Sequence, residues 1–382
     1  MSVRDAGAPL NVAVLGAAGT IASAIVRDLA ESEEVAHLQL LDLDAQRASE
    51  VARSHGAGKA SSARVDAREA AGRNGLESVL AGCDVLVNSA SYRINIRAMQ
   101  AALSAGCHYL DLGGLYWMTA RQLELHERFR QAGRIAVLGI GSSPGKTNVM
   151  AAAAVRSLAP EPVRSIHVSA ASRDPEAAAG EGGPLRLPYS LQTLLDEITL
   201  APVMLQDGRP TELAPLSTGG EVRFDEPIGA AETIHALHSE LQTFAASFHC
   251  EQASFRVSFT GQLLGRLREL AGASPEQVLE AGHRALHQSA QTVSCHVVEA
   301  ASQQRRVRVS ALTRPMPEWG LGGGIVSTAA PAAAAVRLLA RGHITATGVH
   351  PPELCIEPDQ LFAELERRAC TFTTEIEQGA AV

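Results

Sequence analysis

The sequence predicts an α/β fold, in which a parallel-sheet domain precedes a second α+β domain built on a mostly antiparallel sheet. Up to about residue 147, short apolar runs that end in glycine or small residues alternate with segments of helical spacing. Beyond that point apolar and polar residues alternate with a period of two, as in half-buried antiparallel strands. A chain of 382 residues is also long enough to form two hydrophobic cores.

The first domain is predicted over residues 1–147, from five nearly continuous apolar runs that suit parallel strands buried on both faces. The predicted strands are Asn11–Leu15, His37–Leu41, Asp84–Val87, Tyr109–Leu112 and Ile135–Leu138. The segments with helical spacing between them are Ile21–Ala30, Ala45–Ser54, Asn95–Ala105 and Thr119–Ala132. This alternation predicts βαβ units with helices on both faces of the sheet.

The second domain is predicted over residues 148–328, with substrate contacts and a subunit interface. Its predicted strands are Ser165–Ala170, Ser254–Thr260, Thr292–Ala300 and Arg305–Leu312, and its predicted helices are Leu191–Leu200, Ile228–Ser239 and Ser274–Leu286. Residues 329–382 are expected to form C-terminal helices that pack back on the first domain, starting with an alanine-rich helix opened by Pro331.

Composition argues against several classes of protein. A formal charge of −8 disfavours a nucleic-acid or anionic-membrane surface, because phosphate binding requires clustered Lys and Arg. The six cysteines form no C-x-x-C pair, so we expect no disulfide framework and a cytoplasmic location. The longest apolar runs, such as Met150–Val155, are far shorter than the roughly 20 residues of a membrane span. We expect a small-molecule substrate and a homodimer.

The first strand–helix turn, G16-A-A-G19-T-I-A22, is a variant of the dinucleotide fingerprint. Glycine permits the tight turn, and small residues let the backbone approach a pyrophosphate at the helix N-terminus. Alone this spacing is weak, but a clean strand precedes the turn and a helix follows it. The turn therefore predicts a Rossmann-type domain that binds a nicotinamide dinucleotide.

Asp42 ends the second predicted strand, 26 positions after Gly16, near the roughly 20 expected for an acid that binds the adenosine ribose. A carboxylate there repels a 2′-phosphate and favours NAD over NADP, although Arg47 could soften this preference. The predicted cofactor-binding residues are Gly16, Ala18, Gly19, Thr20, Ile21, Asp42, Leu43, Ser89, Ala90 and Ser91.

Several motifs resemble the saccharopine dehydrogenase-like family across nearly the whole chain. They are the GAAGTIA turn, AGCHYLDLGG (105–114), GIGSSPGKTNVMA (139–151), Leu237–Glu240 and GVHPPELC (348–355). The family includes saccharopine reductases, carboxynorspermidine dehydrogenases and lysine 6-dehydrogenase, and the last is closest in layout. The resemblance implies NAD(P)-dependent oxidation or reductive formation of a C–N bond in an amino acid. Ser143 replaces the family's acidic residue and Lys146 an apolar one, which puts saccharopine itself in doubt as the substrate.

A compact polar set around His235, His238 and Glu240 is the first candidate for the proton transfers of amine oxidation. The two histidines would lie on one face of a helix. His238 could be the base, because its reference pKa lies near working pH, while Glu240 orients it or holds a substrate ammonium. For His235 a structural role is favoured, as a polar residue whose hydrogen bonds are made within the protein. No metal is predicted, because a third ligand at the usual spacing is absent.

Lys146 is the second candidate, as a group that binds a substrate carboxylate or exchanges a proton, with a solvated surface lysine as the alternative. The residues predicted to contact substrate are Tyr92, Arg93, Gly113 and Tyr189. For Tyr92, Arg93 and Tyr189, a side chain that faces solvent is the favoured alternative. The acidic residues Asp196, Glu197 and Asp225 are interpreted as structural.

The sequence thus predicts an NAD(P)-dependent oxidoreductase that acts on the amine of an amino acid, most like lysine 6-dehydrogenase. The alternative within enzymes is reductive condensation of an amine with a carbonyl, as in saccharopine or carboxynorspermidine formation. The alternative of another class is a non-catalytic dinucleotide-binding sensor or scaffold.

Overall fold

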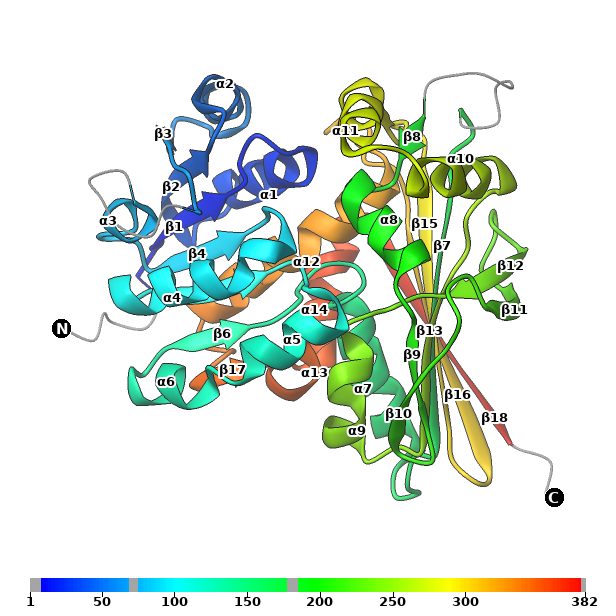
Figure 1. Ribbon diagram of the computed structural model, residues 1–382. Coiled ribbons are helices and arrows are strands. Elements are labelled where there is room, and N and C mark those ends of the chain that lie inside the picture. The colour runs from blue at the N-terminus through cyan, green and yellow to red at the C-terminus, as the bar shows by residue number, and fades with distance from the viewer. Residues whose placement is uncertain (1–7, 69–74, 177–184, 379–382) are drawn as a thin grey trace. The chain divides into compact units, whose positions relative to one another are not determined.

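The computed structural model describes residues 8–68, 75–176 and 185–378 (Figure 1). The chain divides into two compact units, each assembled from two segments. Unit 1 comprises residues 1–149 and 328–365, and unit 2 comprises residues 150–327 and 366–382. Helices α7 (Lys146–Leu158) and α12 (Gly323–Ala340) each contain a boundary between the two units, and the third boundary falls before Glu366, the last residue of α14.

Unit 1 is built on a seven-stranded parallel sheet in the order β17-β6-β5-β4-β1-β2-β3, within the described residues. The strands are β1 (Leu10–Leu15), β2 (Val35–Asp42), β3 (Ala60–Arg64), β4 (Val85–Asn88), β5 (His108–Asp111), β6 (Ile135–Val137) and β17 (Gly348–His350). The order from β3 to β6 is that of dinucleotide-binding domains, in which the ligand lies beyond the strands' carboxyl ends where the order reverses. Here that point lies between β1 and β4.

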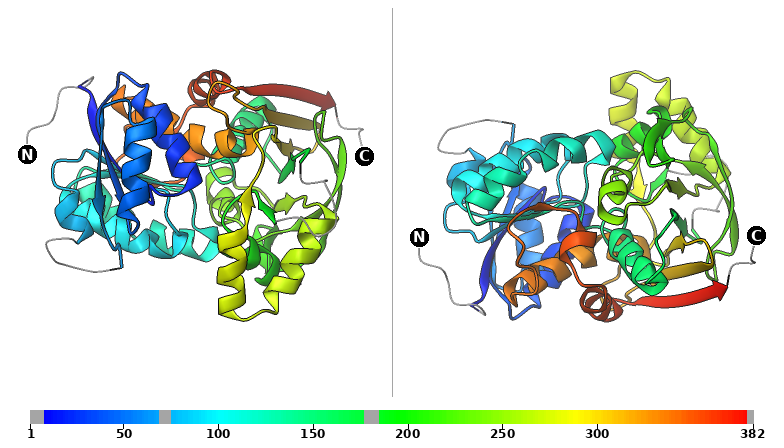
Figure 2. Two further views of the ribbon diagram at one scale, coloured as in Figure 1. Left: turned by 90° about the horizontal axis from the view of Figure 1, so that it is seen from above. Right: turned by 90° about the horizontal axis from the view of Figure 1, so that it is seen from below.

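Helices cover both faces of this sheet, with α4 and α6 on one face and α12 on the other (Figure 2). The helices of unit 1 are α1 (Thr20–Ala30), α2 (Ala45–His55), α3 (Leu76–Val79), the 3-10 turn η1 (Tyr92–Ile94), α4 (Asn95–Ala105), α5 (Leu115–Leu123), α6 (His126–Gln131), α13 (Pro352–Cys355) and α14 (Pro358–Glu366). Helix α1 forms because Ala22, Ile25, Val26 and Leu29 recur at helical spacing, and all four are buried. The strands are buried on both faces, which explains their continuous apolar runs.

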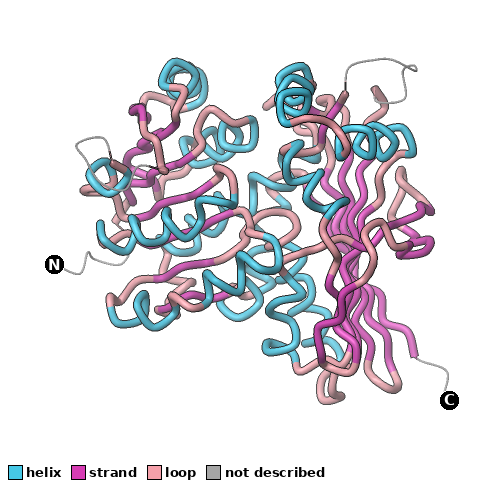
Figure 3. The backbone as a smooth tube through the Cα atoms, viewed as in Figure 1, coloured by secondary structure: helices cyan, strands magenta, loops and turns pink. Residues whose placement is uncertain are grey.

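Unit 2 contains a nine-stranded mixed sheet and a two-stranded ribbon, within its described residues (Figure 3). The strands are β7 (Ser165–Arg173), β8 (Arg186–Leu187), β9 (Val203–Gln206), β10 (Arg209–Glu212), β11 (Thr218–Arg223), β12 (Ala230–His235), β13 (Gln252–Val257), β14 (Leu286–His287), β15 (Val293–Ala301), β16 (Arg305–Thr313) and β18 (Cys370–Gln378). The helices lying wholly in unit 2 are α8 (Leu191–Thr199), α9 (Glu240–Phe248), α10 (Gly261–Ala271) and α11 (Pro275–Arg284).

The predicted fold class is confirmed, but individual elements differ. The predicted helix Ile228–Ser239 is wrong, because residues 230–235 form β12, which pairs with β11 and β13. Residues 370–378 form strand β18 of the unit 2 sheet instead of C-terminal helix. The predicted helix Thr119–Ala132 is divided between α5 and α6, and Pro331 lies inside α12 instead of opening it.

Helix α12 also corrects the expectation that no segment is long and apolar enough for a membrane span. Among the described residues, α12 is the one helix that is long and apolar enough to cross a membrane. However, 83% of its 18-residue window is buried inside the structure, as in a helix of a protein core.

Candidate nucleotide-binding turn and acid–base cluster

The turn after β1 has the backbone geometry that a pyrophosphate site requires. Gly16 has a φ of +80°, which side chains rarely adopt, and a Cβ there would lie 2.7 Å from the amide nitrogen of Ala90. Gly19 is the N-cap residue of α1, so the N-terminus of this helix opens directly after the turn. The amides of a first helical turn and the positive end of the helix dipole favour an anion at a helix N-terminus. The residues therefore fit a dinucleotide's phosphates.

Asp42 holds the turn in place from the end of β2. Its carboxylate accepts hydrogen bonds from the amides of Ala18 and Asp44, both at 2.9 Å. A carboxylate has about four lone-pair sites, so Asp42 can still accept from ribose hydroxyls. Arg47, exposed on α2, donates from Nε to the carbonyl oxygen of Ala18 at 3.2 Å. A carboxylate and a guanidinium thus lie together beside the turn.

The other predicted cofactor residues lie around the same strand ends. Ser89 donates from both its amide and its hydroxyl to the carbonyl oxygen of Leu15, at 2.9 Å each. Ala90 lies against Gly16, and Ser91 is the exposed N-cap residue of η1. Thr20 and Ile21 begin α1, and Leu43 is exposed directly after β2. Their contacts with a cofactor stay a prediction.

We expect the Asp42→Ala variant to bind NAD at least about tenfold more weakly, since hydrogen bonds to charged groups contribute about 1.5–3 kcal/mol. Its preference for NAD over NADP should shrink as well, because the carboxylate no longer repels a 2′-phosphate. The Arg47→Ala variant should lose NADP affinity alone. Fluorescence titration of both variants with both cofactors checks this. Unchanged NAD affinity of Asp42→Ala would show that the ribose assignment is wrong.

A buried polar network lies under the carboxyl ends of β4 and β5, and reasoning from the sequence missed it. Asp111 accepts hydrogen bonds from the amides of Gly113 (2.9 Å) and Gly139 (2.7 Å), and from Nε2 of Gln122 (2.6 Å). Asn95 joins the network through Asp111 and the carbonyl oxygen of Gly113. Burial raises the pKa of Asp111, against the opposing effect of these bonds. Asp111 therefore fixes two glycine-containing loops. The sequence feature that could have indicated this network is the occurrence of glycine-rich segments, LDLGG and GIG, at the ends of two predicted strands.

Lys146 is fully buried at the start of α7, which excludes the solvated alternative. It follows a tight loop in which the amide of Gly141 donates to the carbonyl oxygen of Pro144 at 2.8 Å. Two residues on, Asn148 accepts from the amide of Gly145 and donates to the carboxylate of Glu353, both at 2.8 Å. A substrate-binding or proton-exchanging role for Lys146 stays a prediction.

In unit 2 the structure brings together three predicted residues, namely His238, Glu240 and Tyr189. His238 and Glu240 are buried, and Nδ1 of His238 is hydrogen-bonded to Oε2 of Glu240. The imidazole stacks on the ring of Phe255, with centroids 3.6 Å apart and planes 10° from parallel. The start of α9 and strand β13 thus fix the ring from two directions.

Glu197, which was interpreted as structural, completes this group. Its Oε2 accepts a 2.5 Å hydrogen bond from the hydroxyl of Tyr189. Burial raises the pKa of Glu197 to about 7, against the opposing effects of His238 and Tyr189. Burial lowers the pKa of His238, but Glu240 and then Glu197 outweigh it, so the pKa lies above its usual value. We call His238, Glu240, Glu197 and Tyr189 the acid–base cluster.

Not all candidates join the cluster. His235 does not share a helical face with His238, because it ends strand β12, where it pairs with Arg256 of β13. Tyr92 and Arg93 form the 3-10 turn after β4, with the guanidinium 4.9 Å from the ring centroid. Their substrate contacts stay a prediction. No group of three metal-ligating residues occurs among the residues that the structure describes.

The raised pKa of Glu197 predicts a specific pH dependence of stability. The pKa of this carboxyl is about 7 in the folded chain, above its usual value of 4.5, so the folded chain binds the proton more tightly. The resulting stabilisation is fully present below 4.5 and is lost as pH rises through about 7. Between pH 5 and 8, the wild-type melting temperature should therefore fall relative to that of Glu197→Gln. Calorimetry checks this, with the exposed Glu232→Gln as control, and parallel profiles for wild type and Glu197→Gln would contradict it.

Known proteins similar to this chain support the assignment of unit 1. Residues 12–137 match the saccharopine dehydrogenase NADP binding domain. A carboxyaminopropylagmatine dehydrogenase from Synechocystis sp. is 24% identical in an alignment of 281 residues that covers 71% of this chain and 67% of that protein.

Two solved structures are similar over 96% of this chain. Apo saccharopine dehydrogenase (L-Glu forming) from Saccharomyces cerevisiae has a TM-score of 0.69 at 14% identity, over 100% of that chain. Homospermidine synthase from Legionella pneumophila, solved with NAD, has a TM-score of 0.74 at 11% identity, over 91% of that chain. At these identities the two structures show the fold.

The predicted cofactor class, a nicotinamide dinucleotide, is confirmed by the domain match. The family resemblance drawn from the motifs is confirmed as well. Residues 12–137 thus form a saccharopine dehydrogenase NADP binding domain.

Proposed function

We propose that the chain makes or breaks the C–N bond of an amino-acid-like amine, with a nicotinamide dinucleotide as the hydride carrier. The observation that carries the proposal is the buried acid–base cluster, in a chain that also has the dinucleotide turn. The names of two similar dehydrogenases, of carboxyaminopropylagmatine and of saccharopine, support an amine-containing substrate.

When bound, a nicotinamide dinucleotide would supply the acceptor or donor of a hydride for the carbon that carries the nitrogen. The chain must move protons in both reactions, because the reacting amine has to be neutral. In deamination, water attacks the imine and ammonia leaves; in joining, the amine attacks the carbonyl and water leaves, so that an imine is there to be reduced. We assign this exchange to His238, whose reference pKa lies near neutrality. Glu240 occupies Nδ1 of the ring, so the exchange is assigned to Nε2. Glu197, with a pKa of about 7, can take up or release a proton beside it.

Two reactions use this chemistry, and we place the joining of an amine to a carbonyl first. The name carboxyaminopropylagmatine describes two amine-bearing parts joined together, and the Legionella neighbour is a synthase. Oxidative deamination of a side-chain amine, as by lysine 6-dehydrogenase, is second, supported by the layout of the sequence motifs. A non-catalytic sensor remains the alternative of another class.

A turnover screen at 340 nm (the NADH and NADPH absorbance band) tests the proposal. Consumption of NADH or NADPH only when amine and aldehyde or keto acid are both present supports the joining reaction. Production of NADH from L-lysine alone supports the second reaction. Tight cofactor binding without turnover across the panel would contradict an enzymatic role.

A cytoplasmic location and a homodimer are further parts of the proposal. All six cysteines are free thiols, which agrees with a reducing compartment. Sedimentation velocity of the purified protein tests the dimer.

A further inference from the structure

A polar cavity lies in unit 2, on the face of the sheet opposite His238. Successive residues of a strand point to opposite faces, so Phe255, which carries the stacked His238, and Arg256 lie on different sides of β13. The cavity has a volume of about 320 Å³ and lies between the β11–β12 hairpin and the sheet. Figure 1 shows this hairpin beside β13. The charged and imidazole side chains that line it are His167, His235, Arg256, Glu299 and Arg306.

Arg256 is the central cation of this cavity and is incompletely bonded. Its Nη1 donates to the carbonyl oxygen of Gly219 and its Nη2 to Oε2 of Glu299, both at 3.4 Å. These distances exceed the usual 2.7–3.2 Å range of N–H···O bonds. Its Nε is buried and has no hydrogen-bond partner among the described residues. A guanidinium presents five donors in a planar fork that suits an oxyanion, so Arg256 has donors to offer.

The surroundings of Arg256 favour a negatively charged ligand. Arg306 adds a second positive charge, and Glu299 is the one carboxylate among the lining residues. Burial, followed by the charge of Arg256, lowers the pKa of His167 to about 4, and the same two causes lower the pKa of His235. Both imidazoles are therefore neutral at pH 7. Nδ1 of His167 is hydrogen-bonded to the hydroxyl of Ser254 at 2.8 Å, so His167 can donate to an anion through Nε2. His235 can donate one hydrogen bond as well.

The backbone is shaped around the Arg256 side chain. A Cβ placed on Gly219 would lie 2.6 Å from Oγ1 of Thr233 and 2.9 Å from both Cγ and Cδ of Arg256. The absence of a side chain at position 219 therefore lets the stem of Arg256 pass against strand β11. Substitution by alanine should displace the guanidinium without changing the charge of the cavity.

We propose that this cavity binds a small organic anion through a carboxylate or phosphate group held by Arg256. A volume of about 320 Å³ falls at the lower end of pockets that hold small molecules. The site is separate from the acid–base cluster and is independent of the proposed reaction.

Isothermal titration calorimetry of the full chain, at constant ionic strength, tests the proposal with inorganic phosphate and with succinate as probes. Wild type should bind at least one of them, and the stronger of the two identifies the anionic group. The Arg256→Gln variant should bind at least about tenfold more weakly, and Gly219→Ala several-fold more weakly. Glu299→Gln should bind more tightly, because it removes the carboxylate that competes for Arg256. The exposed Arg268→Gln on α10 is the matched control and should bind like wild type.

Three results would overturn the site: no binding of either probe by wild type, equal affinities of wild type and Arg256→Gln, or an equal loss in Arg268→Gln. If Arg256→Gln fails to fold, the tighter binding of Glu299→Gln decides the question, since a folding defect cannot increase affinity. The titration measures binding and not turnover. Failure of the anion site can therefore be told apart from failure of the proposed reaction in the amine screen.

Discussion

The His238→Asn variant is expected to lose about 10²- to 10⁴-fold in kcat in the C–N bond reaction, the range that a positioned acid–base group contributes. Asparagine keeps a polar side chain near Glu240 but cannot exchange a proton near neutral pH. Cofactor affinity should be unchanged, because the nucleotide turn lies in unit 1. Steady-state kinetics, together with a cofactor titration, measure the two effects separately.

The matched control for this variant is His249→Asn at the other end of α9. His249 is exposed and has a φ of +55°, a conformation that asparagine tolerates well. We expect it to keep wild-type kcat. In addition, Glu240→Gln should lower the pH at which activity falls off on the acid side, because Glu240 raises the pKa of His238. A kcat for His238→Asn within threefold of wild type would refute the assigned role.

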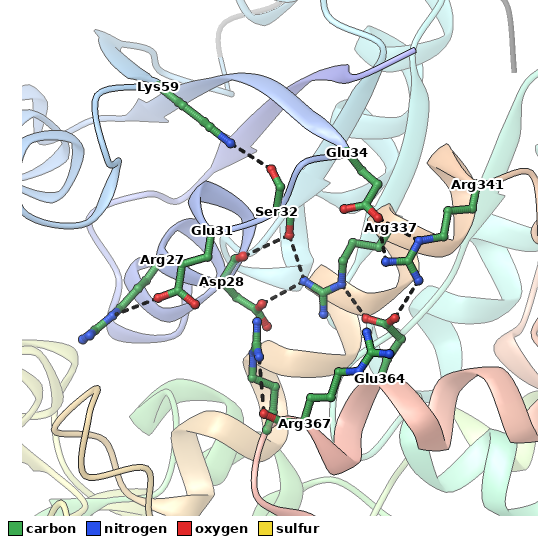
Figure 4. Close-up of polar contacts among 11 residues, drawn as sticks. Arg27, Asp28, Glu31, Ser32, Glu34, Lys59, Arg337, Arg341, Glu364 and Arg367 are labelled. Atoms are coloured by element: carbon green, nitrogen blue, oxygen red, sulfur yellow. Dashed lines mark hydrogen bonds and ion pairs between the residues drawn. The ribbon is translucent and has the colours of Figure 1, made fainter. Parts of the chain in front are cut away.

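The Arg337→Met variant is expected to lose about 3–5 kcal/mol of stability in unit 1, because it removes the shared cation of two buried carboxylates. Glu364 keeps its ion pair with Arg341 at 2.7 Å, so most of the loss should come from Asp28. Arg337 lies on α12 and is 5% exposed. It donates to Asp28 of α1 at 2.8 Å and to Glu364 of α14 at 2.5 Å, so one guanidinium joins three helices (Figure 4). Ser32 accepts a further bond at 3.1 Å.

The measurement is urea unfolding followed by circular dichroism, with hydrogen exchange of residues 20–34 to locate the effect in α1. The exposed Arg53→Met on α2 should change stability by less than about 0.5 kcal/mol, as most surface substitutions do. We expect Arg337→Lys to recover only part of the loss, because an ammonium cannot span both carboxylates in the planar fork of arginine. Equal unfolding midpoints for Arg337→Met and Arg53→Met would show that the ion pairs contribute nothing.

The strands of unit 1 were predictable where a run of apolar residues ends at a glycine, as β1 does before Gly16. Strand β17 was not predictable, because it has three residues and its partner β6 is more than 200 residues away in the sequence. Strand β18 is mostly exposed and so lacks a strong apolar alternation. Residues 230–235 have helical spacing, but pairing with two strands decides their conformation, since tertiary contacts override local propensity.

The candidate site was predictable only in part, for a similar reason. His238 and Glu240 are close in sequence, and the structure places their side chains in contact. Glu197 was missed because Asp196 and Glu197 are adjacent acids on one predicted helix, and nothing local shows which one meets Tyr189. The donors of Arg256 that lack good partners could not be predicted either, because they depend on where the fold places the backbone of β11.

The division of each unit into two chain segments has a consequence for synthesis on the ribosome. When residue 149 has been made, the nucleotide domain still lacks β17 and the helix that carries Arg337. Strand β6 is then an open sheet edge, and Asp28 has no Arg337 beside it. The domain can close only after about 200 more residues have emerged. An expression clone cut at residue 149 would carry the same defects, so an autonomous nucleotide domain must include residues 328–365.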